Sequence, residues 1–135
     1  MTAITVPATT TRDSFLRFAL RLDAVGSGLM GVAGLAFGPQ IAELSGTTTS
    51  FEYTVGALFV AYSVAVLVLS GRPSVRQTGR VCAIGNLVYS VATVVAVLAG
   101  VFPLTTAGIV GTLGSGVFTL VMADLQYLGL RRIRA

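Results

Sequence analysis

The sequence predicts an all-α, polytopic membrane protein: an antiparallel bundle of four transmembrane helices forming a single membrane domain over residues 1–135. The composition is the first observation, because 54% of the residues are hydrophobic and only 10% are charged. The mean hydropathy of +0.87 is far above that of a soluble domain. The second observation is that long stretches carry no charge, and the third is that the basic residues are confined to three places. A β-barrel would need segments of about ten residues that alternate in polarity, and the chain has none.

The first predicted span covers residues 15–38. Its apolar run, Ala24–Gly38, is short for a crossing, and we expect it to be extended by the preceding turns, with Arg17 and Arg21 snorkelling toward water. Pro39 stands where a signal peptidase would have to cut, so we expect an uncleaved membrane anchor.

The other predicted spans cover residues 53–71, 81–102 and 103–128. Their charge-free stretches are long enough to cross a hydrocarbon core of about 30 Å at a rise of about 1.5 Å per residue. We expect residues 1–13 to be flexible and residues 40–50 to form a short polar loop.

The basic residues predict the orientation of the helices. All nine are arginines, placed before the first span, between the second and third spans, and after the fourth: Arg12, Arg17, Arg21; Arg72, Arg76, Arg80; Arg131, Arg132, Arg134. With four crossings these three places lie on one side, so the positive-inside rule predicts a multi-pass membrane protein with both termini cytoplasmic. We expect the arginines to contact anionic headgroups of the bilayer there, and their juxtamembrane positions argue against a nucleic-acid partner.

A candidate polar cluster lies near the predicted cytoplasmic ends of the spans. It consists of Arg21, Asp23, Asn86 and Asp124, of which Asn86 and Asp124 are expected about 10 Å deep. A buried carboxylate in a membrane is often a proton or cation site, but ion pairs and hydrogen bonds between helices would produce the same pattern. We favour the structural interpretation, because no acidic residue reaches the midplane of a span.

Small residues predict how the helices pack. From Asp23, one face of the first span continues through Ser27, Gly31, Gly34 and Gly38. In lipid, close approach over small residues and interhelical hydrogen bonds bring helices together. We therefore place this face inside the bundle, and we assign the Gly34–Gly38 pair to packing within the monomer before a homodimer.

Residue types that carry common chemistry are scarce. Cys82 is the one cysteine and the chain has no histidine, so this chain alone cannot build an intramolecular disulfide, a zinc cluster or a dithiol pair. The serines within the spans lack a histidine or lysine to activate them. The sequence therefore predicts no enzyme, with no catalytic residue, cofactor or metal.

The segment RLDAVGSG at residues 21–28, the glycine-rich run after it and GPQIAELSG at residues 38–46 resemble the small four-span integral membrane proteins of actinobacteria, many of which begin with an RLDA-type motif. The resemblance implies the four-span fold and an inner-membrane location, and supplies no catalytic residue. The chain is also similar in layout to DoxX-like four-span proteins, but it shows no set of redox-active residues that would support a redox role. It departs from small multidrug transporters, which are shorter and carry a glutamate within the first span.

Two functions remain open. The first is a non-enzymatic interaction or accessory subunit of a membrane-protein partner, because the sequence shows no soluble domain. The second is a small transporter or lipid-binding channel with a cytoplasm-facing polar site, as a monomer or a homodimer. A cavity open to the cytoplasm at Asp23, Asn86 and Asp124 would favour the second function, and a closed, fully paired cluster would favour the first.

Overall fold

A computed structural model describes residues 12–134, without the side chain of Arg134. These residues form four helices and no strand: α2 (Ser14–Ser45), α3 (Thr49–Leu69), α4 (Arg76–Ala99) and α5 (Thr106–Arg134). All four are long and apolar enough to cross a membrane. The predicted all-helical four-span fold is confirmed, whereas most of the segment expected to be flexible, residues 1–11, lies outside the described residues.

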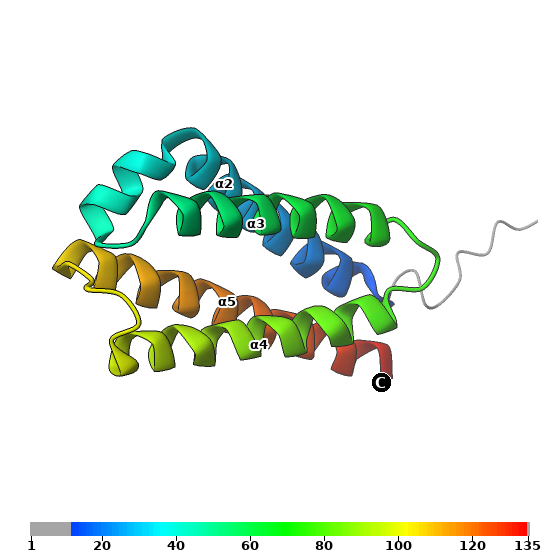
Figure 1. Ribbon diagram of the computed structural model, residues 1–135. Helices are drawn as coiled ribbons and strands as arrows, with labels where there is room; N and C mark the ends of the chain where they lie inside the picture. Colours follow the sequence, from blue (N-terminus) through cyan, green and yellow to red (C-terminus); the bar gives the residue numbers. More distant parts are fainter. Residues whose placement is uncertain (1–11, 135) are drawn as a thin grey trace, which may run out of the picture.

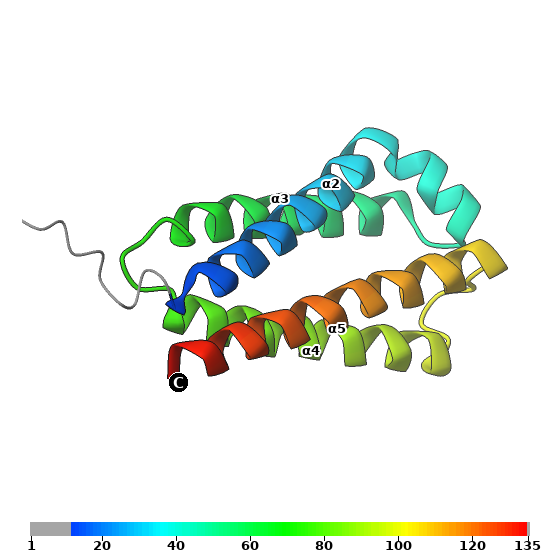
Figure 2. The same ribbon diagram turned by 180° about the vertical axis from the view of Figure 1, so that it is seen from behind.

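The helices form two antiparallel pairs, seen as an upper and a lower layer in Figure 1. α3 packs mainly on α2 and α4 mainly on α5, while α2 and α5 provide the main contact between the pairs. The start of α2, the α3–α4 linker and the end of α5 gather at one end of the bundle (Figure 2). We call this the arginine end, and we call the opposite end, formed by the linkers at 46–48 and 100–105, the loop end.

The prediction that the first helix ends at residue 38 and that a loop follows over 40–50 is wrong. α2 bends at Phe37, whose φ of −126° and ψ of 23° are not helical, and then continues to Ser45. Pro39 lacks the N–H that would bond to the carbonyl four residues earlier, and this missing bond accounts for a kink at that point. The proline therefore bends the helix without ending it.

The end of α2 is fixed by a glycine. Gly46 has a φ of 82°, in the left-handed region where a side chain would be strained, and its N–H donates to the carbonyl of Ala42 at 2.9 Å. The connection to α3 is consequently very short, and Thr48 begins the next helix by accepting a hydrogen bond from the N–H of Phe51.

Glycines let α2 and α3 cross with their backbones in contact. A Cβ atom added at Gly31 would lie 2.7 Å from the carbonyl oxygen of Gly56, and one added at Gly56 would lie 2.9 Å from the carbonyl oxygen of Gly31. Gly34 lies at the same crossing, because a Cβ atom added there would be 3.3 Å from the Cα of Gly56. The structure therefore places Gly31 and Gly34 where α2 packs on α3 within one chain.

Substituting Gly56 with leucine is expected to separate α2 from α3 and to destabilise the bundle by about 1–3 kcal/mol, because the new side chain meets backbone that cannot move aside. The measurement is thermal unfolding of the full chain in one mild detergent. Gly85→Leu on α4 is the matched control, since an added Cβ there meets nothing within 4 Å. Equal melting temperatures for the two variants would show that the crossing is not tightly packed.

The apolar core lies at the arginine end. Its buried members come from α2, α3, the α3–α4 linker and α4: Leu16, Leu20, Ala24, Val66, Val75 and Cys82. Tyr62, Leu130 and Ile133 pack against them. The buried apolar side chains are therefore concentrated at this end of the bundle.

Candidate functional site

The carboxylate of Asp23 lies between the helices and is completely buried. Its Oδ2 accepts hydrogen bonds from the hydroxyl of Tyr62 at 2.6 Å, from Nδ2 of Asn86 at 2.7 Å and from Nε2 of Gln126 at 2.8 Å. Its Oδ1 accepts a hydrogen bond from the hydroxyl of Ser27, one turn along α2, at 3.1 Å. A single carboxylate thus receives donors from every helix of the bundle.

The two amides also bind each other. Nδ2 of Asn86 donates to Oε1 of Gln126 at 3.0 Å, so that Asp23, Asn86 and Gln126 form a closed ring of hydrogen bonds. We call the five residues Asp23, Ser27, Tyr62, Asn86 and Gln126 the Asp23 network. Every donor in this network is neutral, and the one ion pair recorded among residues 12–133 joins Arg17 to Asp13.

The structure brings together only two members of the predicted cluster, Asp23 and Asn86. Arg21 is exposed, and its Nε donates to the hydroxyl of Ser70 at 3.3 Å. Asp124 is also exposed. The expected approach of Asp124 is wrong because it lies about 140° around the helix from Thr119, which faces the bundle interior.

Gln126 takes the place expected for Asp124, and sequence reasoning missed it. Gln126 is completely buried, and it follows the buried Thr119 by seven residues, which is about two helical turns on the same face. Extending the small-residue face of α5 by two turns would have found it. Tyr62 was missed because the sequence gives its position in the span but not the helix that it meets.

Gln126→Leu is expected to destabilise the bundle by about 1–3 kcal/mol, because it leaves donors of Asn86 and acceptor positions of Asp23 unpaired inside the protein. Asp124→Leu is the control on the same helix and is expected to change stability by less than about 0.5 kcal/mol, since that side chain is exposed. Thermal unfolding in detergent measures both. A larger loss for Asp124→Leu would contradict the observed rotation of α5.

The predicted packing face of α2 lies inside the bundle along its whole length. Ser27, Gly31, Gly34 and Gly38 are all buried. Beyond the Gly31 and Gly34 crossing, Gly38 lies against the ring of Tyr53, where an added Cβ would be 2.6 Å from Cε1. This face of α2 therefore packs against α3 and also supplies Ser27, one donor of the Asp23 network.

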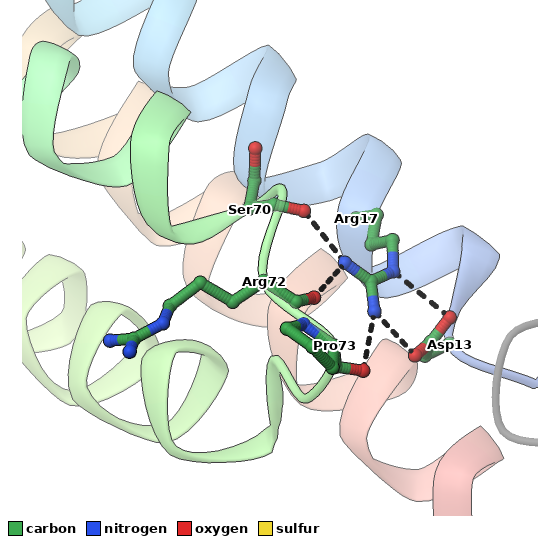
Figure 3. Close-up of polar contacts among 5 residues, drawn as sticks. All are labelled: Asp13, Arg17, Ser70, Arg72 and Pro73. Carbon is green, nitrogen blue, oxygen red and sulfur yellow. Dashed lines mark hydrogen bonds and ion pairs between the residues drawn. The ribbon is translucent and has the colours of Figure 1, made fainter.

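A second polar cluster joins α2 to the α3–α4 linker at the arginine end (Figure 3). The guanidinium of Arg17 binds both carboxylate oxygens of Asp13, at 3.1 Å and 3.0 Å, and the same group donates to three backbone carbonyls. These are Ser70 at 2.8 Å, Arg72 at 2.6 Å and Pro73 at 2.9 Å. We call this cluster the Arg17 clamp.

Arg17, which we expected to snorkel toward water, reaches the linker at the arginine end and is held there by these bonds. Its side chain is only 16% exposed and that of Asp13 only 5%. The carbonyls at a helix C-terminus have no partner within the helix, and the fork of an arginine can bind several of them at once. Arg17 therefore satisfies the backbone where α3 ends and ties it to the first turn of α2.

What these polar groups can do chemically is limited by how completely they are paired. Within the described part of the chain, every buried side-chain nitrogen or oxygen has a hydrogen-bond partner. The donors around Asp23 are already bound to it or to one another, so a substrate reaching Asp23 would have to displace them. The geometry is that of a closed link between helices.

Comparisons with protein-family models, with curated proteins and with solved structures returned no match. The resemblance to four-span actinobacterial proteins with an RLDA-type motif therefore stays a prediction.

Proposed function

We propose that this chain is a multi-pass protein of the bacterial plasma membrane that acts, without catalysing a reaction, as an interaction or accessory subunit of another membrane protein. The observation that carries the proposal is the closed Asp23 network. Its polar atoms form hydrogen bonds that join α2, α3, α4 and α5. Because these atoms are already paired with one another, they leave no hydrogen-bonding group for a substrate. The outer surfaces of the helices remain for contact with lipid and with a partner.

The alternative of a transporter or channel with a cytoplasm-facing polar site is less well supported. Such a site would need Asp23 to reach water at the arginine end, and the buried side chains of Leu16, Leu20 and Val75 lie at that end. Arg21 and Asp124, which would widen the polar site, lie on the outside of the bundle.

The proposed orientation places the arginine end in the cytoplasm, because every arginine that the structure describes belongs to that end. A fluorescent reporter active only in the cytoplasm, fused after Ala135, is expected to give a signal. Ser50→Cys, at an exposed position of the loop end, is expected to react with a membrane-impermeant thiol reagent added to intact cells. The unmodified chain is the control, because Cys82 is buried. A silent reporter together with an unreactive Ser50→Cys would reverse the orientation.

The function is tested by purifying the tagged full chain from its native membrane in mild detergent. We expect a second membrane protein in constant stoichiometry, and we expect the abundance of that protein to fall in cells that lack this chain. Gly56→Leu serves as the control for specificity, because a bundle with a disturbed crossing is expected to lose the partner. A partnerless chain that moves a solute across liposomes, and that loses this flux in Asp23→Asn without a change in melting temperature, would overturn the proposal.

A further inference from the structure

A cavity of about 480 Å³ lies between the two helix pairs at the loop end of the bundle. All four helices line it, through the second half of α2, the first half of α3, the second half of α4 and the first half of α5. No member of the Asp23 network belongs to its lining. Its volume falls within the range of about 300–1,000 Å³ that is usual for small-molecule sites.

Glu52 is the one charged residue in the lining of this cavity. The hydroxyl of Thr47 donates to its Oε1 at 2.6 Å, and no cation is paired with the carboxylate among residues 12–133. The described arginines all belong to the arginine end, so the protein itself supplies no positive charge here. The lining therefore carries one acidic group and no basic one.

Aromatic rings surround the apolar part of the cavity. Phe51, Phe59 and Tyr89 line it. The rings of Phe59 and Tyr89 meet edge to face with their centroids 5.5 Å apart, and Phe51 contacts Phe102 at 4.7 Å. These rings give the cavity an apolar wall of the kind that is usual in small-molecule sites.

Three other polar side chains of the lining, Ser115, Tyr89 and Thr93, are paired with protein groups. The hydroxyl of Ser115 donates to the carbonyl of Thr112 at 2.7 Å, which leaves its oxygen to accept from the hydroxyl of Tyr89 at 3.0 Å. The hydroxyl of Thr93 donates to the carbonyl of Ser90 at 2.7 Å. The charge of Glu52 is therefore the group in this cavity best able to select a ligand.

We propose that the cavity binds a small amphipathic cation, a quaternary or protonated amine that carries an apolar body. The positive group lies at the Glu52 carboxylate, and the apolar body lies among the rings of Phe51, Phe59 and Tyr89. An anion would be repelled by Glu52. A lipid acyl chain would fill the apolar part but would leave the carboxylate without a positive partner. This site is independent of the proposed accessory role, which rests on the Asp23 network.

The test uses the full chain in an uncharged maltoside detergent, which contains no amine, and benzyltrimethylammonium as the probe, with binding measured by calorimetry. We expect saturable binding at one site and none of benzenesulfonate. Glu52→Gln keeps an acceptor for Thr47 but removes the charge, and it is expected to weaken the affinity about 10-fold or more. Glu43→Gln is the matched control, an exposed acid near the same end that is absent from the lining, and its affinity is expected to be unchanged.

A second variant tests the cavity without altering its charge. Ala96→Phe places a ring in the space that the lining residue Ala96 borders, and it is expected to abolish binding while the chain remains folded by thermal unfolding. Equal affinities of the unmodified chain and Glu52→Gln would overturn the proposal, as would an absence of binding to the unmodified chain. A phospholipid that native mass spectrometry finds bound and that the cation does not displace would also overturn it, and would assign the cavity to an acyl chain.

Discussion

Asp23→Leu is expected to destabilise the bundle by about 3–5 kcal/mol, the largest loss that we expect from any single substitution. The leucine removes the acceptor shared by the hydroxyl of Tyr62 and the amides of Asn86 and Gln126. The two amides can still bind each other, but the remaining donors face apolar surroundings, where an unpaired polar group is costly. The measurement is thermal unfolding in mild detergent, with the fraction of monodisperse chain as a second readout.

Asp23→Asn is the matched variant and is expected to be tolerated, with a loss below about 1.5 kcal/mol. Its amide oxygen can take the place of Oδ2 and accept the three donors, while its NH₂ group turns toward the hydroxyl of Ser27, which can accept. A collapse of Asp23→Asn equal to that of Asp23→Leu would show that the negative charge itself is required. Such a result would contradict the interpretation of the network as a set of hydrogen bonds between helices.

Arg17→Ala is expected to cost about 2–3 kcal/mol, because it leaves the buried carboxylate of Asp13 without its cation and frees the carbonyls of Ser70, Arg72 and Pro73. Arg17→Lys is expected to recover only part of this loss, since an ammonium group cannot reproduce the planar fork. Thermal unfolding compares both with Arg21→Ala, whose side chain is exposed and makes one recorded bond, of 3.3 Å.

Limited proteolysis at the α3–α4 linker gives an independent check of the same clamp. The linker carbonyls of Arg72 and Pro73 are bound by Arg17, so Arg17→Ala is expected to increase cleavage there while Arg21→Ala does not. Unchanged cleavage in Arg17→Ala, together with a melting temperature equal to that of Arg21→Ala, would show that the clamp contributes nothing to stability.

The sequence was sufficient to predict the four helices and the inward face of the first one. Hydropathy and length define a span, and small residues three or four positions apart define its packed side, so Asp23, Ser27, Gly31 and Gly34 could be placed correctly. The pairing of Asp23 with Asn86 also followed, because both lie on such faces near the same end.

The partners from α3 and α5 could not be fixed in the same way. Asp124 and Gln126 lie two positions apart, about 200° around a helix, so choosing between them requires the rotation of α5. Asp124 was chosen because it is charged, whereas Gln126 is the residue that lies on the buried face of α5. Hydropathy also does not show that α2 continues past Pro39. The cavity at the loop end depends on how all four helices are arranged around it, which the sequence of each helix does not record.

The Asp23 network has a consequence for biogenesis, because its members are synthesised far apart in time. Asp23 emerges first, and its partners on the other helices follow after 39 residues at Tyr62, 63 residues at Asn86 and 103 residues at Gln126. At about 5–20 residues per second, the last partner arrives on the order of 5–20 s after the carboxylate. A nascent chain interrupted before α5 would hold an incompletely paired carboxylate, so hydrogen bonding at Asp23 distinguishes a finished polypeptide from a truncated one.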